Sequence, residues 1–261
     1  MQKNKIKILI LNYNGRKFLK DCLNSIHLID YNDYSVVLID NGSIDDSVEY
    51  VRLNHPNVEI FKNEKNLMYA GGYNRFFEND SDACYYMILN NDTIVDKNVL
   101  NGLMDGVNRY GKKNIYGPKI MYMNKKDKIW FSGGKINLNK GIIKHLNIRK
   151  SDDSLNVTDS KTDYITGCCL FFHSDIIKKL KGFDESFNMY MEDVDFCMRA
   201  KEFGFNSYFL SSPKIFHHVS GTVNGKIFKI ISAYIKLSFK YTGILSVFNI
   251  PLFSLRKLFR L

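Results

Sequence analysis

The sequence predicts an α/β protein with a mainly parallel central sheet, helices on both faces of the sheet, and a basic helical tail. Three observations lead to this prediction. Short apolar runs of strand length alternate with helical segments through the first third of the chain, a pattern typical of βαβ units whose strands pair in parallel. Several of these runs end in asparagine or aspartate. No acidic residue follows Glu202, although lysine and arginine recur there among bulky apolar residues.

The first half of the chain supplies four predicted strands separated by predicted helices. The strands cover Ile6–Asn12, Ser35–Asp40, Val58–Lys62 and Cys84–Asn90. The helices cover Arg16–His27, Asp45–Leu53 and Ala70–Glu78, and a fourth begins near Asp96. The second helix starts with Asp45 and Asp46, which suit the positive end of a helix dipole.

Beyond Gly111 the alternation is less regular. The strands predicted in this part cover Ile115–Met123, Ile129–Ile136 (interrupted by Gly133 and Gly134) and Tyr164–Phe172. Residues 137–162 are polar, and we expect them to form a flexible excursion. We therefore predict one α/β domain over residues 1–222 and a helical tail over 223–261.

Composition indicates a globular protein, with 45% hydrophobic and 14% aromatic residues. The chain contains no uninterrupted apolar run of the length that spans a membrane, and its first residues lack the architecture of a signal peptide. The five cysteines are scattered and form no C-x-x-C pair, so we expect reduced thiols in a cytosolic protein and no zinc site.

The net charge of +10 is concentrated at the C-terminal end. Lysines in this part alternate with residues such as Ile227, Phe228, Ile231 and Tyr234 at close to helical spacing. This pattern predicts a helix that lies on an anionic membrane surface. Two alternatives to membrane contact would use the same residues. The helix could pack on the domain with its lysines in solvent, or it could form a homodimer interface. No recognisable nucleic-acid motif accompanies the charge, so a nucleic-acid partner is not expected.

Acidic residues crowd an otherwise apolar segment at residues 185–200. Glu192, Asp193 and Asp195 lie within four positions of one another. Helical spacing places Asp195 one turn before Arg199, so these two side chains are predicted to form an ion pair. Asp193 is left as the carboxylate that is available for chemistry. A helix start stabilised by acidic residues is the alternative interpretation.

A second polar cluster follows the fourth predicted strand. Asn90, Asn91 and Asp92 come directly after an apolar run. Ligands of open α/β sheets bind at the carboxyl ends of strands, and oxygen ligands of this kind suit a hard divalent cation that also carries substrate phosphates. The three residues could equally form a turn that caps the next helix.

Several motifs together resemble the inverting family 2 glycosyltransferases, which have the GT-A fold. The matching segments are I-L-I-L-N-Y-N-G (8–15), V-L-I-D-N-G-S (37–43), N-E-K-N-L-M-Y-A-G-G-Y-N (63–74), L-N-N-D (89–92), T-G-C-C-L-F-F (166–172), the acidic segment with its preceding G-F-D (182–199) and H-H-V-S-G-T (217–222). Their order is more specific than any one of them, and the resemblance extends to about Thr222. Among family members, the chain looks most like bacterial rhamnosyltransferases that build cell-surface polysaccharides, including O-antigen.

The resemblance implies a nucleotide-sugar donor site and a metal site. The residues at matching donor positions are Asn12, Asn14, Asp40, Asn66, Gly71, Gly72, Asn90 and Asn91. Asp92 stands at the last position of the family's D-x-D motif, whose first acid is here an asparagine. It would hold Mn²⁺ or Mg²⁺ together with His217, for which the adjacent His218 is the alternative.

The resemblance also implies the catalytic and acceptor residues. Asp193 matches the general base that removes the proton of an acceptor hydroxyl, and Glu192 accompanies it. Trp130, Gly167 and Tyr190 are the candidate acceptor residues, although Trp130 could instead fill the core.

The predicted activity is therefore transfer of a sugar from a UDP- or dTDP-sugar to a glycan or lipid-linked acceptor. We expect the enzyme to be peripheral to the cytoplasmic face of the cell membrane. Two alternatives remain at this stage: a nucleotidyltransferase that forms sugar nucleotides, and a non-catalytic membrane-bound partner of the same fold. The first is disfavoured because no glycine-rich basic loop follows the first predicted strand.

Overall fold

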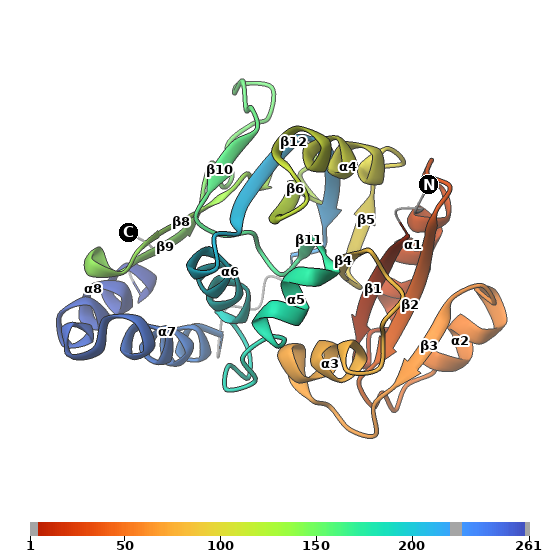
Figure 1. Ribbon diagram of the computed structural model, residues 1–261, viewed down its shortest axis with the longest axis horizontal. Helices are drawn as coiled ribbons and strands as arrows, with labels where there is room; N and C mark the ends of the chain where they lie inside the picture. Colours follow the sequence, from red (N-terminus) through yellow and green to blue (C-terminus); the bar gives the residue numbers. More distant parts are fainter. Residues whose placement is uncertain (1–4, 220–225, 259–261) are drawn as a thin grey trace.

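The computed structural model describes residues 5–219 and 226–258, and within these residues ten strands form one sheet. The strand order across the sheet is β10-β12-β6-β11-β4-β1-β2-β3, while β5 pairs with β12 and β7 with β6 (Figure 1). In chain order the strands are β1 (Ile6–Asn12), β2 (Tyr34–Asp40), β3 (Glu59–Lys62), β4 (Tyr85–Asn90), β5 (Thr93–Val95), β6 (Asn114–Tyr122), β7 (Ile129–Phe131), β10 (Ser160–Thr162), β11 (Cys169–His173) and β12 (Asn206–His217).

The α/β fold with a largely parallel central sheet is confirmed. Strands β3, β2, β1 and β4 pair in parallel, and so do β6 and β12. β11 is inserted between β4 and β6 and runs antiparallel to both, so β6 and β12 point the same way as β4. In the parallel pairing of β1 with β2, Asn12 lies opposite Asp40. The polar residues that end these strands therefore meet at one edge of the sheet.

Eight α-helices are described: α1 (Arg16–His27), α2 (Ser47–Asn54), α3 (Met68–Phe77), α4 (Val99–Tyr110), α5 (Ser174–Leu180), α6 (Glu192–Glu202), α7 (Lys226–Thr242) and α8 (Ser246–Leu258). Right-handed crossovers place α1 and α2 on one face of the sheet and α3 on the other, because the chain steps outward from β1 to β3 and then returns to β4. Rings on the α3 face join α3 to α6: Phe183 lies 6.2 Å from Tyr73 and 4.6 Å from Phe196.

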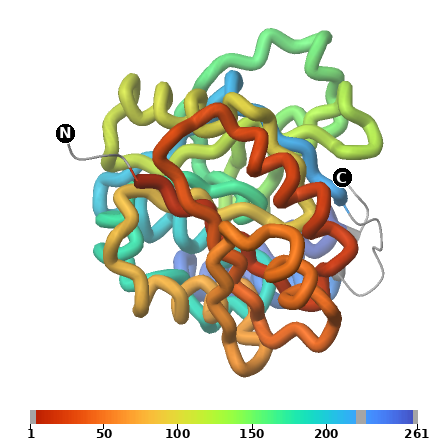
Figure 2. The backbone as a smooth tube through the Cα atoms, turned by 90° about the vertical axis from the view of Figure 1, so that its right-hand side faces the viewer, coloured from red at the N-terminus to blue at the C-terminus, as the bar shows by residue number. Residues whose placement is uncertain are grey.

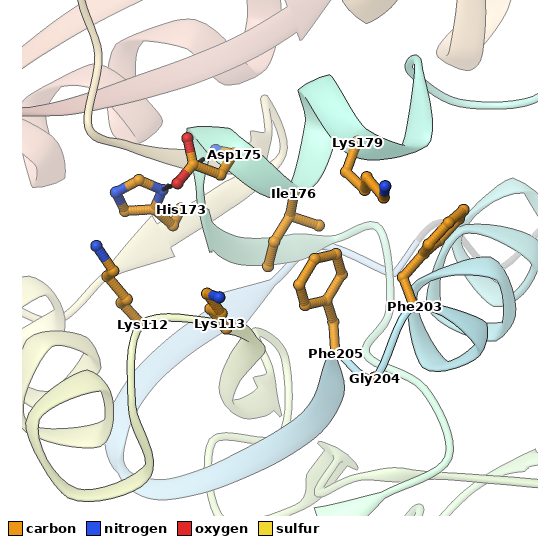
Figure 3. Close-up of a pocket in the computed structure, with 9 residues that line it drawn as sticks. All are labelled: Lys112, Lys113, His173, Asp175, Ile176, Lys179, Phe203, Gly204 and Phe205. Carbon is orange, nitrogen blue, oxygen red and sulfur yellow. Dashed lines mark hydrogen bonds and ion pairs between the residues drawn. The ribbon is translucent and has the colours of Figure 1, made fainter.

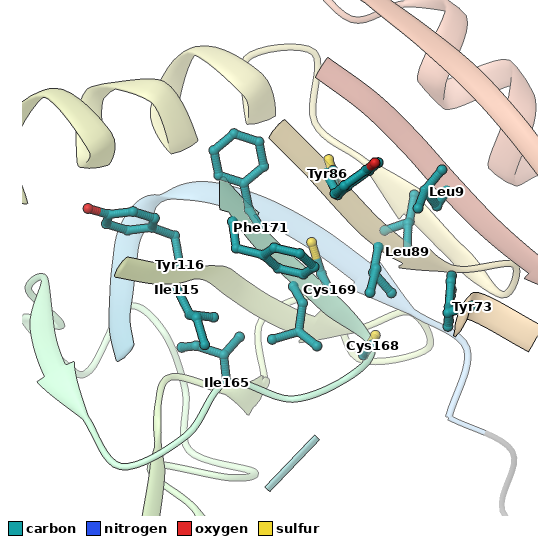
Figure 4. Close-up of a cluster of buried hydrophobic side chains, with 14 of the residues drawn as sticks. Leu9, Tyr73, Tyr86, Leu89, Ile115, Tyr116, Ile165, Cys168, Cys169 and Phe171 are labelled. Atoms are coloured by element: carbon teal, nitrogen blue, oxygen red, sulfur yellow. The ribbon is translucent and has the colours of Figure 1, made fainter. Parts of the chain in front are cut away.

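The core lies between the sheet and these helices. Strands β1, β4, β6 and β11 supply fully buried aliphatic and aromatic side chains, including Leu9, Leu89, Ile115 and Phe171 (Figure 4). Cys168 and Cys169 are buried in the same cluster. Successive side chains of a strand point to opposite faces of the sheet, and both faces are covered here. These strands are therefore apolar almost throughout.

Three predicted elements differ from the structure. The strand expected over Ile129–Ile136 is divided into β7, in the large sheet, and a strand of a separate hairpin that begins at Gly134. The strand expected over Tyr164–Phe172 begins only at Cys169, because the backbone nitrogens of Ile165 and Gly167 donate to Cys197 and Asp193 on α6. The segment 137–162 was expected to be a flexible excursion, which is wrong in part. It contains a short 3₁₀ helix η1 (Leu138–Lys140) between hairpin strands β8 (Gly134–Asn137) and β9 (Ile142–His145), and later β10, which pairs with β12.

The hairpin is ordered because the C-terminal helices pack on it. Gly141, at φ +58°, lies so close to α8 that a Cβ there would be 2.7 Å from the backbone nitrogen of Phe253. The rings of Tyr234 on α7 and Phe253 on α8 stack with centroids 3.7 Å apart. The Tyr234 hydroxyl donates to the carbonyl of Leu138 at 3.4 Å. The predicted tail is thus helical, and its boundary at 222/223 lies outside the described residues.

Across the described ranges, no helix is long and apolar enough to cross a membrane. The tail and the first strands lie at opposite ends of the long axis of the molecule. Figure 1 shows α7 and α8 at one end and β3 with α2 at the other, and Figure 2 views the molecule along that direction.

Candidate active site

The ends of β1 and β2 form a buried cluster of polar side chains, which we call the donor floor because predicted donor-binding residues gather in it. Asn12 and Asp40 are both fully buried. The backbone nitrogen of Ser43 donates to Asp40 Oδ2 at 3.1 Å, and Asn12 Nδ2 donates to Ser43 Oγ at 3.1 Å. Asn12 also lies 3.5 Å from Asp40 Oδ1, a long hydrogen bond. These predicted donor residues therefore share one network that fixes the loop after β2.

Asn14 belongs to the same network from the other side. It has a positive φ of 50°, and its backbone nitrogen donates to Ser43 Oγ at 2.9 Å. Its side-chain oxygen accepts from the backbone nitrogen of Ile44 at 2.9 Å. The loops after β1 and β2 are therefore held together by their own side chains, which leaves Tyr13 half exposed beside them.

Asn66 shapes the start of α3. Its side-chain oxygen accepts from Asn41 Nδ2 at 3.0 Å and from the backbone nitrogen of Met68 at 2.8 Å. Gly71 and Gly72 follow in the first turns of α3, where a Cβ on Gly72 would be 2.6 Å from a methyl group of Leu11. The absence of a side chain at Gly72 lets α3 approach the end of β1 closely.

The side chains after β4 join this floor. Asn91 Nδ2 donates to Asn12 Oδ1 at 2.8 Å, and both groups crowd Gly15, whose Cβ would be 2.2 Å from Asn91 Nδ2. Asn90 uses its backbone instead: its nitrogen donates to the carbonyl of Cys168 at 3.0 Å, and its carbonyl accepts from the Thr93 hydroxyl at 2.7 Å. The side chain of Asn91 is thus hydrogen-bonded to the donor floor. Asn90 is bonded through its backbone to Cys168, just before β11, and to Thr93 at the start of β5.

Asp92 and His217 lie together although 125 positions separate them in the chain. β5 pairs with β12 so that His217 is opposite Thr93, and His217 Nε2 comes within 3.2 Å of Asp92 Oδ1. The side chain of His218 packs instead on the ring of Phe18, with centroids 5.8 Å apart. The pairing of strands therefore brings His217, and not its neighbour, to the carboxylate of Asp92.

Two buried atoms of this pair make no hydrogen bond. His217 Nδ1 is inaccessible to solvent and lacks a hydrogen-bond partner, and Asp92 Oδ1 is equally inaccessible and meets His217 Nε2 at 3.2 Å without a hydrogen bond. Buried polar atoms of this kind are uncommon and call for a ligand, and carboxylate oxygen with imidazole nitrogen suits Mn²⁺. In the described parts of the chain, no group of three histidine, cysteine, aspartate or glutamate residues gathers as a metal site. Two side chains of the kinds that bind a divalent cation therefore lie together at the position predicted for the metal.

Trp130 lies beside this pair. Its ring meets the ring of His217 edge-on, with centroids 4.6 Å apart, and that of His145 at the same distance. Burial lowers the pKa of His145 to about 4, so this histidine is neutral at physiological pH. Trp130 is on β7 and lies half-buried between these two imidazoles, beside His217 at the end of β12.

Asp193 is in the first turn of α6, held by backbone donors. Its Oδ2 accepts from the backbone nitrogen of Gly167 at 2.7 Å and its Oδ1 from that of Val194 at 2.8 Å. Burial raises the pKa of Asp193, while these hydrogen bonds oppose the shift. The carbonyl of Gly167 in turn accepts from the Tyr69 hydroxyl at 2.8 Å. Gly167, a predicted acceptor residue, is therefore in contact with the predicted base.

The chain enters α6 through an unusual backbone. Tyr190 and Met191 are consecutive residues in the left-handed region, at φ 72° and 69°. Each such non-glycine residue costs about 1–3 kcal/mol, and such strain is concentrated at functional sites. The turn directs Asp193 toward Gly167 and leaves Tyr190, another predicted acceptor residue, half-buried at the rim.

The Asp92–His217 pair and the predicted base both lie near one buried thiol. Burial raises the pKa of Cys168 well above its usual value, and the charges of both Asp92 and Asp193 add to this shift. Cys168 is therefore within electrostatic reach of both carboxylates. The sequence offered no reason to select Cys168, Tyr69 or Asn41, because ordinary core and loop positions contain the same residue types.

Glu192 is buried, and its Oε2 has no hydrogen-bond partner. Burial raises its pKa, and the charge of Asp193 raises it further. Between the unfolded pKa of about 4.3 and the raised folded value, the folded protein binds more protons than the unfolded chain, so its stability falls as pH rises.

Glu192→Gln should therefore be more stable than the parent protein, by a margin that is absent near pH 4 and grows toward pH 8. Urea unfolding at several pH values measures this margin. Glu202→Gln, an exposed position on the same helix, is the control and should show no such trend. A pH-independent difference for Glu192→Gln would contradict the raised pKa.

A cavity lies elsewhere in the part of the chain that the structure describes. It has a volume of about 410 Å³ and is lined by Lys112, Lys113, His173, Asp175, Ile176, Lys179, Phe203, Gly204 and Phe205 (Figure 3). His173 pairs with Tyr85 at the start of β4, whereas Cys169 pairs with Leu89 near its end. This cavity is thus at the sheet edge opposite the predicted site residues, and we assign it no role in their chemistry.

Comparison with known proteins identifies the family. The family described as Glycosyl transferase family 2 matches residues 7–181, which is more than half of the chain. The chain belongs to glycosyl transferase family 2. Membership identifies it as a glycosyltransferase and disfavours the nucleotidyltransferase alternative. Glu192, Asp193 and His217 lie beyond the matched range.

One curated relative extends the similarity. An N-acetylglucosaminyl-diphospho-decaprenol L-rhamnosyltransferase from Mycobacterium tuberculosis is 25% identical over 232 residues, which cover 82% of this family 2 chain and 76% of the relative. The resemblance to rhamnosyltransferases that the sequence indicated is confirmed at this level.

Solved structures support the GT-A fold. The crystal structure of GalNAc-T7 with UDP, GalNAc and Mn²⁺ superposes with a TM-score of 0.73 at 14% identity, covering 94% of this chain and 49% of that one. S. aureus TarS 1–349 in complex with UDP gives a TM-score of 0.62 at 15% identity, covering 98% and 72%. The chain therefore spans about half the length of GalNAc-T7, and at these identities the likeness concerns the fold alone.

Proposed function

We propose that this family 2 enzyme transfers a sugar, with inversion, from a UDP- or dTDP-sugar to a hydroxyl of a glycan or lipid-linked acceptor in cell-surface polysaccharide synthesis. The observation that carries the proposal is the gathering of three groups at one sheet edge: the Asn12–Asp40 floor, the Asp92–His217 pair and Asp193. The named activity of the mycobacterial relative, on a lipid-diphosphate acceptor, supports the acceptor class.

The donor would lie with its nucleoside over the floor formed by the loops after β1 and β2. Asp40 offers carboxylate oxygens to hydroxyl or amide donors of the nucleoside, and Asn12, Asn14 and Asn66 fix the loops around it. Gly71 and Gly72 allow the α3 backbone to approach the ligand. The complexes of TarS with UDP and UDP-GlcNAc support a nucleotide ligand for a protein of this fold.

Asp193 would act as the general base. Its carboxylate accepts the proton of the acceptor hydroxyl as that oxygen bonds to the anomeric carbon and the bond from that carbon to the diphosphate oxygen breaks. One displacement of this kind inverts the anomeric centre, and a positioned base contributes about 10²- to 10⁴-fold. The backbone nitrogen of Gly167 holds this carboxylate in place. Glu192 has a raised pKa, so it is protonated more readily than an exposed glutamate and adds no full negative charge beside Asp193.

Asp92 and His217 would hold Mn²⁺ or Mg²⁺, with Asn90 and Asn91 beside them. When bound, such an ion supplies charge that stabilises the departing nucleoside diphosphate. GalNAc-T7 was solved with Mn²⁺ and UDP, which supports a divalent metal in this fold. Trp130 and Tyr190, on either side of the site, are the proposed acceptor contacts, and the proposed location is the cytoplasmic face of the membrane.

Calorimetric titration of UDP, dTDP and GDP, with and without Mn²⁺, tests this proposal. We expect one nucleotide to bind only with metal, and Asp92→Ala to weaken that binding at least about tenfold, a loss typical even of groups that only support metal ligands. Asp105→Ala, an exposed position on α4, is the control and should bind as the parent does. Failure of every nucleotide to bind, with or without Mn²⁺, would contradict the proposed donor site.

A further inference from the structure

The outward face of α8 is apolar. Val247, Phe248, Pro251, Leu252 and Leu255 are all exposed, at the spacing that places residues on one side of a helix. Ile244 and Leu245 of the preceding 3₁₀ helix η2 (Gly243–Leu245) extend this surface, with exposed fractions of 83% and 55%. We call these seven residues the α8 stripe. Apolar surface gathered in this way on an otherwise folded chain marks an interaction site.

The inward face of α8 is the more polar one. Ser246 and Asn249 are buried, and Asn249 Oδ1 accepts hydrogen bonds from the hydroxyls of Ser238 at 2.6 Å and Tyr234 at 3.2 Å. Asn249 Nδ2 donates to Thr242 Oγ1 at 3.2 Å. Rotating α8 to bury the stripe would break this network, since a buried amide needs its partners. The stripe is therefore held outward by specific contacts.

We infer that the α8 stripe is a membrane-docking surface that inserts at the headgroup–acyl boundary of an anionic bilayer. The charge around the stripe favours this partner. No acidic residue follows Glu202, and the exposed side chains of Lys229 and Arg256 pair with no acid in the parts of the chain that the structure describes. Anionic headgroups attract such residues while the apolar side chains enter the interface.

The same charge argues against a second copy of the chain as the occupant. A two-fold interface places the same patch on both sides, so each basic residue would face the basic tail of its partner. Neither copy offers an acid in this region to offset that repulsion. Of the tail lysines, Lys240 is already paired internally, with Asp195 at 2.6 Å and Asp184 at 2.7 Å.

Docking through α8 would hold the active site near the bilayer. Lys240 on α7 contacts Asp195 on α6, two positions after Asp193, so one ion pair links the helix that packs on α8 to the helix that carries the proposed base. This placement rests on the proposed function, since a lipid-linked acceptor needs the site close to the bilayer, but vesicle binding itself does not depend on it.

Co-sedimentation with vesicles tests the inference. Vesicles of phosphatidylcholine alone and with phosphatidylglycerol should be compared for the full chain and for the double variant Phe248→Ser/Leu252→Ser. We expect the parent to bind the anionic vesicles, more weakly as salt rises, and the double variant to bind at least about tenfold more weakly. Lys229→Gln/Arg256→Gln should lose the preference for anionic vesicles.

The matched control is Leu53→Ser. Leu53 is 74% exposed, close to the 73% of Phe248, but lies on α2 at the opposite end of the molecule (Figure 1). The Leu53→Ser variant should bind vesicles as the parent does. Equal binding by parent and double variant, or no binding by the parent, would overturn the inference. So would a dimer, seen by light scattering, that only the stripe variant dissociates. Nucleotide titration of the same samples shows separately whether the donor site is intact.

Discussion

Asp193→Asn should lower kcat by about 10²- to 10⁴-fold, because the variant keeps the size of the side chain but cannot accept the acceptor proton. The donor floor is formed by other strands, so nucleotide affinity should change little. Initial rates with a nucleotide sugar and a lipid-linked acceptor measure the first effect, and calorimetry measures the second. Retention of most of the activity would exclude Asp193 as the base.

The pH profile provides a second measure of Asp193. The base must be ionised, and burial raises the pKa of this carboxyl, so kcat/KM of the parent should fall as pH drops through that raised value. The residual activity of Asp193→Asn should lack this acidic limb. Glu202→Gln, exposed at the far end of the same helix, is the control and should keep both the rate and the profile of the parent.

Asp195→Ala should reduce the free energy of unfolding by about 3–5 kcal/mol, the loss that follows when one partner of a buried ion pair is removed. Asp195 is fully buried. It accepts from Arg199 Nε at 2.8 Å, from Lys240 Nζ at 2.6 Å and from the Tyr241 hydroxyl at 2.8 Å. Its removal would leave Arg199 without its counter-ion and Lys240 with Asp184 alone, at the contact between α6 and α7. Urea unfolding measures the loss.

A surface pair provides the comparison for Asp195. Arg75, on α3, forms an ion pair at 3.0 Å with Glu78, which directly follows the helix, but both side chains are about 60% exposed. Glu78→Ala should therefore cost less than about 1 kcal/mol. A similarly small cost for Asp195→Ala would mean that the tail contributes little to holding α6. The larger cost would identify α7 as a structural support of the helix that carries the proposed base.

Local pattern predicted much of the fold. The apolar runs that became β1, β2 and β4 are almost entirely buried, and the pairing of Asp195 with Arg199 follows from helical spacing alone. The polar residues that end these strands could be grouped because parallel strands end at the same edge. Asn12, Asp40 and Asn91 do meet there.

Other features depended on contacts between distant parts of the chain. The insertion of β11 antiparallel between β4 and β6 has no signature in its apolar sequence, which would suit either direction. The part of the hairpin formed by η1 and β9 was expected to be flexible, because the helices that pack on it, α7 and α8, come about a hundred residues later. Pattern analysis treats such segments separately and therefore misses the packing that orders them.

The sequence by itself determined the α/β class, the family resemblance and the acidic and amide residues at the strand ends, because these depend on periodicity and on short motifs. Only the tertiary structure decided which partners those residues have. It brought His217 rather than His218 to Asp92, placed Gly167 against Asp193, and turned Lys240 inward while leaving the α8 stripe exposed. The physical reason is that strand pairing and helix packing set these distances, and neither is encoded in the spacing of residues along the chain.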